Sequence, residues 1–225
     1  AWCETLQRFG TMSLADVMQP AIKHAARGYV VTPYLHECIA DSAGEMLKDR
    51  DISAIYLPNG TPLKVGERVV QSKYAETMTY IAQRGEAALY HGPLGDILVD
   101  YMKRKGGFIA REDLTGYKTV ERQPIRADYR GWQILGPPPP AASGVHITQM
   151  LNILEGYDIA KLGFGSAETI HYLAEVLNIA FADRAAASGD PEFINVPVER
   201  LTSKAYADER RRAIDSNRAQ VWGAG

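Results

Sequence analysis

Four consecutive prolines stand at the centre of Leu135-Gly136-Pro137-Pro138-Pro139-Pro140-Ala141-Ala142-Ser143-Gly144-Val145-His146-Ile147, the segment from which we interpret the architecture. Each proline fixes φ and lacks a backbone N–H donor, so the run belongs to neither a helix interior nor a central strand. It predicts a stiff, extended polyproline II rod. The residues after the rod let the chain turn, and Ser143 is suited to cap the helix that follows.

A helix is predicted directly after this turn, because apolar residues recur there at spacings of three and four up to Gly156. The residues of this pattern are Val145, Ile147, Met150, Leu151, Ile153 and Leu154. The simpler interpretation of the rod is a rigid connector from a strand into this helix. The alternative is that rod and turn line a ligand site, because helix N-termini attract anions.

Two β-prone runs precede the rod and flank the sequence Asp128-Tyr129-Arg130-Gly131. Their apolar members are Val120, Ile125, Ala127, Tyr129, Trp132, Ile134 and Leu135. This pattern predicts two antiparallel strands with a turn near Arg130-Gly131, and the second strand runs straight into the rod.

Upstream of the hairpin, helical spacing and helix-ending glycines predict helices over residues 2–9, 14–27, 33–47, 73–84 and 93–104. Ser13 and Ser72 stand where N-caps are expected. We expect Ile55-Tyr56-Leu57 to form a short strand and residues 61–70 to form a loop.

Downstream of the rod, Ser166 is predicted to cap the longest helix, whose wide apolar face over residues 170–181 indicates burial on more than one side. Ser203 is predicted to cap a last helix that ends near Ile214. We expect the charged face at residues 209–212 to be solvated.

These segments predict an α+β fold that is mostly helical and contains a β-hairpin. We treat residues 1–225 as a single domain, in which the proline rod and the helical C-terminal part cover residues 137–215. The 225 residues are 46% hydrophobic and 23% charged, as in ordinary globular proteins.

The net charge of −2 gives no basic field that would suit nucleic acid or an anionic membrane. No run reaches the roughly 18 apolar residues of a transmembrane helix. Cys3 and Cys38 do not make a disulfide framework; whether they pair stays open, and Cys38 is expected to be a buried thiol. Neither end resembles a natural terminus, so we expect a fragment or a processed chain.

Known catalytic and metal-binding patterns are absent from the sequence. The five histidines have no HExxH spacing and no cysteine cluster beside them. They are His24, His36, His91, His146 and His171. Ser143 does not lie in a G-x-S-x-G elbow, and the isolated glycine pairs near Gly92 and Gly163 lack the flanks of a nucleotide-binding fingerprint.

Two residue pairs have both a catalytic and a structural interpretation. Ser143 and His146 are imaginable as nucleophile and base, but a cap and a surface histidine are the simpler interpretation. Asp183 and Arg184 are expected to form a buried ion pair or a helix-end anchor rather than a catalytic pair. From the residues alone the chain is an α-rich globular fragment without an assigned function.

The proline run and the motifs after it resemble the large-subunit sequence of the γ-glutamyltranspeptidases, and cephalosporin acylases of the same family share them. The matching motifs cover nearly the whole chain. They are Phe9-Gly10-Thr11, Pro20-Ala21-Ile22, Gly106-Gly107-Phe108, Pro137 to Gly144, Gly163-Phe164-Gly165-Ser166, Ala180-Phe181-Ala182-Asp183-Arg184, Gly189-Asp190-Pro191 and Leu201-Thr202-Ser203-Lys204. Ala141-Ala142-Ser143-Gly144 stands where many transpeptidases have Ser-Ser-Gly-Gly, which favours the acylase branch.

This resemblance implies an N-terminal nucleophile hydrolase with an αββα sandwich, made as an inactive precursor that cleaves itself into a large and a small subunit. The exposed threonine of the small subunit then attacks a γ-glutamyl or a cephalosporin side-chain amide, and its α-amine serves as base. The enzyme would be a γ-glutamyltransferase or cephalosporin acylase without a cofactor. Family members are often exported, which suggests a periplasmic or secreted protein; the cytoplasm is the alternative.

This sequence departs from the family pattern because it contains neither a Thr-Thr-His-like junction nor the segment with the substrate-carboxylate arginine. We therefore assign no catalytic residue and no metal ligand to this chain, and its substrate-binding residues stay unknown. The resemblance implies that residues 1–225 are the C-terminal portion of the large subunit, with the small subunit and the rest of the large subunit as partners. The competing hypothesis is a non-catalytic helical protein-interaction module that presents the proline rod.

Overall fold

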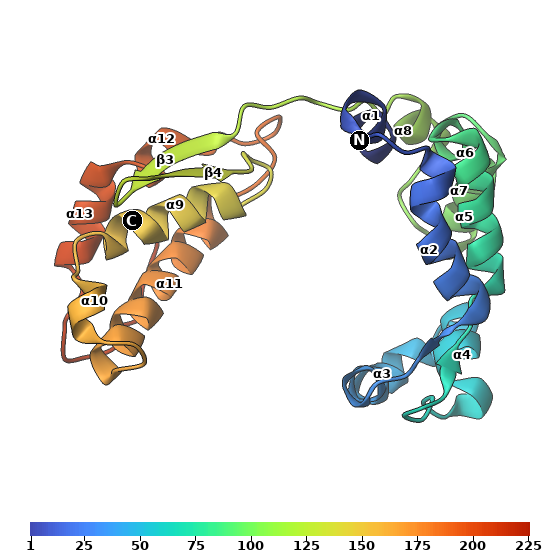
Figure 1. The fold of residues 1–225 in the computed structure, drawn as a ribbon, viewed down its shortest axis with the longest axis horizontal. Helices are drawn as coiled ribbons and strands as arrows, with labels where there is room; N and C mark the ends of the chain where they lie inside the picture. The colour runs from blue at the N-terminus through green and yellow to red at the C-terminus, as the bar shows by residue number, and fades with distance from the viewer. The chain divides into compact units, whose positions relative to one another are not determined.

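Helices make up most of the fold in the computed structural model, which describes all residues 1–225 (Figure 1). The chain divides into two units, Ala1–Thr119 and Val120–Gly225. Each unit has its own clusters of buried apolar side chains. The assignment of residues 1–225 to a single domain stays a prediction. No helix of either unit combines the length and the hydrophobicity that crossing a membrane would require.

The first unit contains eight helices, a short 3-10 turn and a two-stranded antiparallel sheet. These elements are α1 (Trp2–Phe9), α2 (Leu14–Arg27), β1 (Tyr29–Val30), α3 (Pro33–Met46), α4 (Arg50–Tyr56), η1 (Pro58–Gly60), β2 (Arg68–Val69), α5 (Ser72–Arg84), α6 (Ala87–Tyr90), α7 (Pro93–Lys105) and α8 (Arg111–Thr115).

The helix signals of the sequence position most of this unit correctly. Ser13 accepts a hydrogen bond from the Asp16 backbone N–H at the start of α2, and Gly106 ends α7 in the left-handed conformation. Helices α2 and α5 pack side by side through a small core of Ala25, Ala75 and Met78 (Figure 1).

Three predictions about the secondary structure of this unit are wrong. Ile55-Tyr56-Leu57 is not a strand: residues 50–56 form α4, because the Asp49 carboxylate accepts from the N–H groups of Asp51 and Ile52 and so caps a helix. The expected loop at 61–70 contains β2, which pairs with β1. Ser72 is the first residue of α5 and makes no side-chain cap.

The second unit contains the hairpin and five helices. Its elements are β3 (Ile125–Tyr129), β4 (Trp132–Gly136), α9 (Ser143–Leu154), α10 (Ile159–Leu162), α11 (Ala167–Ala187), α12 (Val198–Leu201) and α13 (Lys204–Arg212). The fold class is thus confirmed as mostly helical with small antiparallel sheets.

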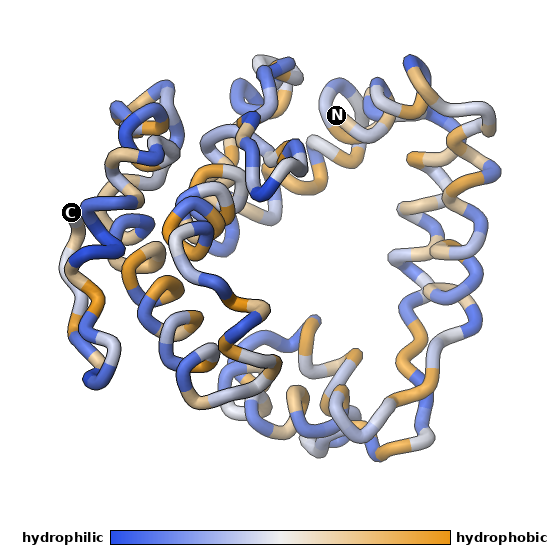
Figure 2. The backbone as a smooth tube through the Cα atoms, turned by 60° about the vertical axis from the view of Figure 1, so that its left-hand side comes forward, coloured by the Kyte–Doolittle hydropathy of each residue, from blue (hydrophilic) through white to orange (hydrophobic).

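Strands β3 and β4 pair in the register that places Tyr129 opposite Trp132, with the turn at Arg130-Gly131 as predicted. Helix α9 packs against α11 and α13, and the core between them contains Ile153, Val176, Ile179 and Ala207 (Figure 1). Hydrophobic positions recur along these helices in Figure 2.

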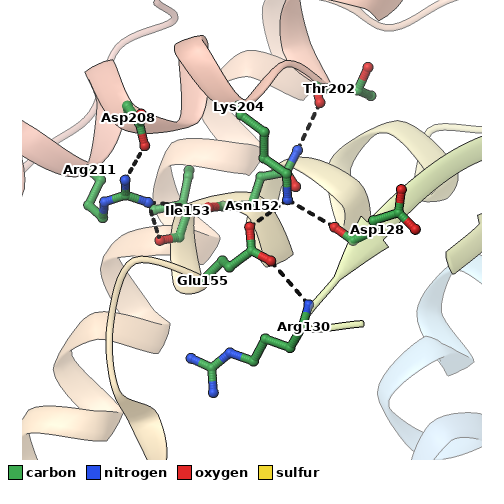
Figure 3. A network of polar contacts seen from close by, with 9 residues as sticks. All are labelled: Asp128, Arg130, Asn152, Ile153, Glu155, Thr202, Lys204, Asp208 and Arg211. Atoms are coloured by element: carbon green, nitrogen blue, oxygen red, sulfur yellow. Dashed lines mark hydrogen bonds and ion pairs between the residues drawn. The ribbon is translucent and has the colours of Figure 1, made fainter. Parts of the chain in front are cut away.

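A polar network joins the hairpin turn to α9 and α13 (Figure 3). The Glu155 carboxylate accepts from Lys204 Nζ at 2.6 Å and from the Arg130 backbone N–H at 3.1 Å. Lys204 Nζ also donates to the Asp128 carbonyl at 2.9 Å, and Asn152 donates to the Thr202 carbonyl at 2.8 Å. The ammonium of Lys204 and the N–H of Arg130 hold the pKa of Glu155 below its ordinary value.

We expect the contribution of Glu155 to the stability of the folded chain to depend on pH. Because the pKa of Glu155 is lower in the folded chain, its contribution is complete above the unfolded value of about 4.3 and is lost as pH falls through the folded pKa. Glu155→Gln should therefore lower the thermal midpoint at pH 7, and the gap to the parent chain should close below about pH 4. Glu209→Gln, at an exposed residue of α13, is the control. A difference in thermal midpoint between Glu155→Gln and the parent chain that stays constant with pH would contradict the lowered pKa of Glu155.

Candidate functional site

The proline segment is a turn and not the straight rod that the sequence predicts. The Ala141 backbone N–H donates to the Pro138 carbonyl at 3.1 Å, which closes a four-residue turn, and the Pro139–Pro140 peptide is cis. The run therefore reverses the chain between β4 and α9, which contact each other. Ser143 is the first residue of α9 and does not cap it; Ala142 occupies the cap position without a side-chain bond.

Gly136 and Gly144 allow this reversal because their backbones meet. A Cβ on Gly144 would lie 2.1 Å from the Pro137 carbonyl oxygen, and one on Gly136 would lie 2.6 Å from the Gly144 Cα. Neither neighbour is a side chain that could move aside. The two glycines thus fix the end of the hairpin directly against the start of α9.

A buried carboxylate, Asp183 on α11, is the centre of a polar network in the second unit. Only 1% of its surface is exposed. It accepts from Gln149 Nε2 and, at 2.8 Å, from the Tyr206 hydroxyl, and Arg210 lies 3.8 Å away. Burial, and then the bond to Asp183, raise the pKa of Tyr206 to about 12, so this hydroxyl stays a donor at neutral pH.

Asp183 is thus buried beside a cation as predicted, but that cation is not Arg184. Arg184 is exposed and lies over the ring of Phe181, 5.5 Å from its centroid, while the cation near Asp183 is Arg210. Adjacent residues on a helix point to different faces, so a buried Asp183 excludes Arg184 from the same core. The expected solvated face at 209–212 is also wrong in part, because Arg210 donates to the Gly223 carbonyl and Arg211 donates to the Ile153 carbonyl.

His146 is buried, at 5% exposure, and not the surface histidine that the sequence predicts. Its Nδ1 lies 3.0 Å from Gln149 Oε1, and its Nε2 lies 2.9 Å from Ser188 Oγ. Since Gln149 donates its amide N–H to Asp183, its oxygen faces His146 and requires a proton on Nδ1. In the neutral ring Nε2 then accepts from the Ser188 hydroxyl.

The structure thus pairs His146 with Ser188 and not with Ser143, which is exposed. Sequence reasoning missed Ser188 because it lies 42 residues from His146. The sequence signal that could have identified Ser188 is its position at the end of the longest helix, directly before Gly189-Asp190-Pro191.

Two hollows flank the proline turn. One, of about 440 Å³, has apolar walls from Pro140, Ala142, Phe181 and Ala185, together with Arg184 and Ser188. The other, of about 530 Å³, lies between Pro138-Pro139 and residues 191–196 and includes Arg122, whose guanidinium lies 3.9 Å from Glu192. The turn therefore lines concave surfaces; that they bind a ligand stays a prediction.

The C-terminal segment, residues 213–225, is bonded to the same helices. Glu175, buried on α11, accepts from Trp222 Nε1 at 2.7 Å and from the Gln220 backbone N–H at 3.3 Å. The Gly225 N–H donates to Asp183 at 2.9 Å. Two buried carboxylates of α11 thus depend on donors from this segment.

The remaining candidate residues do not gather at one place. His36 Nδ1 lies 2.8 Å from the Leu63 carbonyl and His171 Nε2 lies 2.8 Å from the Asp215 carbonyl, while His24 and His91 are exposed. Cys3 and Cys38 are free, and Cys38 is only half-buried, contrary to expectation. No group of three or more His, Cys, Asp or Glu side chains could hold a metal ion.

Comparison with known sequences gives consistent results. The family model described as gamma-glutamyltranspeptidase matches residues 1–223. The Acylase ACY 1 proenzyme of Pseudomonas sp. (strain SE83) is 58% identical over 224 residues, which are 100% of this chain and 40% of the relative. The Glutathione hydrolase proenzyme of Escherichia coli (strain K12) is 43% identical over 216 residues, 96% of this chain and 37% of the relative. The chain thus spans about 40% of the length of these curated relatives.

Solved structures agree with the sequence comparison. The γ-glutamyltranspeptidase of Helicobacter pylori superposes with a TM-score of 0.88 at 32% identity, covering 98% of this chain and 64% of that chain. The cephalosporin acylase of Bacillus halodurans superposes with a TM-score of 0.85 at 30% identity, covering 95% of this chain and 40% of that chain.

The close approach at the turn predicts that Gly144→Ala destabilises the second unit by about 1–3 kcal/mol, because the methyl group would overlap the Pro137 carbonyl. The measurement is the urea midpoint. Gly44→Ala in α3 is the matched control: a Cβ there meets nothing within 4 Å, and the substitution should raise stability by about 0.5–1 kcal/mol. Equal behaviour of the two variants would refute the contact.

Removal of one donor should loosen the C-terminal segment. Trp222→Phe keeps most of the apolar contact but leaves one oxygen of buried Glu175 unpaired, at a cost of about 1–3 kcal/mol. Limited trypsin digestion should then cut after Arg218 faster than in the parent chain. Trp2→Phe, at a residue that is 91% exposed, should leave the cleavage rate unchanged.

Proposed function

This chain belongs to the γ-glutamyltranspeptidase family, and we propose that residues 1–225 are the C-terminal portion of the large subunit of an autoprocessed amidohydrolase or acyltransferase, within a single domain that other segments complete. The observation that carries this proposal is the family match over residues 1–223. The high identity to a proenzyme named as an acylase supports it.

Autoprocessing is supported by the names and the lengths of the relatives. Both curated relatives cited above are called proenzymes. The same segment makes up 64% of the Helicobacter pylori chain but only 40% of the Bacillus halodurans chain. Relatives thus occur as shorter and as longer chains around one common segment, as expected when some are cleaved subunits and others undivided precursors.

The attacking group in this proposal is a threonine at the N-terminus of the small subunit, outside residues 1–225. Its hydroxyl attacks the amide carbonyl, and its own α-amine, with an ordinary pKa near 7.7–8.0, serves as base at neutral pH. The acyl group is then released to water or to an acceptor amine. Residues 1–225 would support that centre and would need no cofactor.

The proposed substrates are γ-glutamyl compounds such as glutathione, or the side-chain amides of cephalosporins. Identity is 58% to the acylase proenzyme and 43% to the glutathione hydrolase proenzyme. The difference favours the acylase branch, as does Ala141-Ala142-Ser143-Gly144 in the proline turn.

Exposed apolar surface supports a partner that completes an αββα sandwich. Helix α11 buries Val176 and Ile179 on one side, yet four large apolar residues on another side stay open to solvent. They are Ile170 at 58%, Leu173 at 41%, Leu177 at 45% and Phe181 at 57% exposure, at spacings of three, four and four. Because each is already about half buried, covering the rest would contribute about 1 kcal/mol per residue. We call these four residues the α11 stripe.

The hairpin supports the same conclusion. It is a sheet of two strands only, so the outer edges of β3 and β4 carry backbone groups without a strand partner. Two-stranded hairpins are marginal alone. In the proposed heterodimer the small subunit and the rest of the large subunit cover the α11 stripe and extend this hairpin, in the periplasm or outside the cell.

Amidase activity should require the complete precursor. The chain 1–225 alone should not hydrolyse γ-glutamyl-4-nitroanilide or a glutaryl-cephalosporin, whereas the self-cleaved precursor should hydrolyse at least one of them. The measurement is product release with both substrates side by side. Amide hydrolysis by residues 1–225 alone would overturn the placement of the nucleophile.

A surface variant separates an enzyme subunit from an interaction module. Leu177→Asp in the precursor should impair subunit assembly and amidase activity together, because it places a charge within the α11 stripe. Phe164→Asp, at a fully exposed and isolated side chain, should do neither. A precursor that binds other proteins but never cleaves an amide would favour the module.

A further inference from the structure

We propose that Ser188 is a nucleophile with His146 as its general base, and that the 440 Å³ hollow beside them accepts small carboxylic esters. The carrying observation is the 2.9 Å separation of Ser188 Oγ and His146 Nε2, which lies in the range of nucleophile and base pairs. This proposal does not rest on the amidase function, and it concerns the chain without its partner, because Phe181 of the hollow also belongs to the α11 stripe.

The histidine is held in the tautomer that this role needs. Gln149 faces Nδ1 with its oxygen at 3.0 Å and donates its N–H to the buried Asp183. Nε2 is therefore the free base, directed at Ser188. When Nε2 takes a proton, the positive ring lies beside the Gln149 oxygen, which is polarised by the Asp183 carboxylate, and this arrangement stabilises the charge.

Ser188 is half-buried and is one of the residues that line the hollow. Phe181, Arg184 and Ser188 follow at spacings of three and four on the end of α11, and Pro140 and Ala142 of the proline turn form the apolar side. The exposed Arg184 guanidinium lies over the Phe181 ring, 5.5 Å from its centroid. The walls thus suit an acyl chain with an apolar body and a terminal carboxylate directed to Arg184.

The reaction proceeds in two balanced steps. Ser188 Oγ bonds to the ester carbonyl carbon while its proton passes to His146 Nε2, and the ester C–O bond breaks as Nε2 returns the proton to the leaving alkoxide or phenolate. Water then attacks the acyl-serine, gives its proton to Nε2, and the acid leaves as Ser188 recovers that proton. No oxidant or cofactor takes part.

A fluorophosphonate probe tests the nucleophile in the chain 1–225, because it phosphonylates base-activated serines with loss of fluoride. We expect a label in the tryptic peptide 185–200 of the parent chain and none in Ser188→Ala. Ser143→Ala, which removes an exposed serine located in a different tryptic peptide, should label like the parent. His146→Gln should slow labelling by about 10²-fold or more.

Substrate recognition is tested with two esters. Arg184→Ala should raise KM at least tenfold for mono(4-nitrophenyl) glutarate and leave KM for 4-nitrophenyl acetate unchanged. This exposed position keeps the test informative if His146→Gln does not fold. A label on Ser143, equal labelling of the urea-unfolded chain, or unchanged ester hydrolysis by Ser188→Ala would overturn the proposal, and none of these outcomes bears on the amidase assay.

Discussion

The burial of one carboxylate, Asp183, governs the packing of the second unit. A charge without water is tolerated only when it is paired and hydrogen-bonded. Its partners come from three separate parts of the chain: the donor Gln149 on α9, the donor Tyr206 and the cation Arg210 one turn apart on α13, and the backbone N–H of Gly225. Helices α9 and α13 must therefore both pack against α11, because the absence of either one removes polar partners from the buried charge. The same requirement orients Gln149 and, through it, the ring of His146.

Local signals were enough for the helices and the hairpin. Ser13, Ser166 and Ser203 cap the helices that the sequence predicts, because a cap depends only on residues three positions away. Tertiary partners were not predictable in this way. Arg184 is adjacent to Asp183 in sequence, but the cation near that carboxylate is Arg210, because helix geometry turns neighbours to different faces. The sequence favoured a cap for Ser143 and a surface position for His146, but His146 is buried and contacts Ser188, which is 42 residues away and so lies beyond any local pattern.

The proline segment shows a different limit. Fixed φ angles correctly excluded helix and strand, but they did not determine whether the run continues straight or turns. The answer depends on Gly136 and Gly144, which allow β4 and α9 to approach each other, and on the hydrogen bond from Ala141 to Pro138. The family resemblance, in contrast, was recognisable from motif order alone, and the match over residues 1–223 confirms it. Motif order reports ancestry, whereas pairing of side chains depends on packing.

The contact between Gly136 and Gly144 holds together the two ends of the proline loop. Since this contact is made by main-chain atoms, the position of the loop ends does not depend on which side chains stand at the tip, residues 138–141. Relatives can therefore exchange side chains at the tip without moving the strand or the helix on either side. Substitutions at the loop tip can therefore change the walls of both adjoining hollows between family members with little effect on folding.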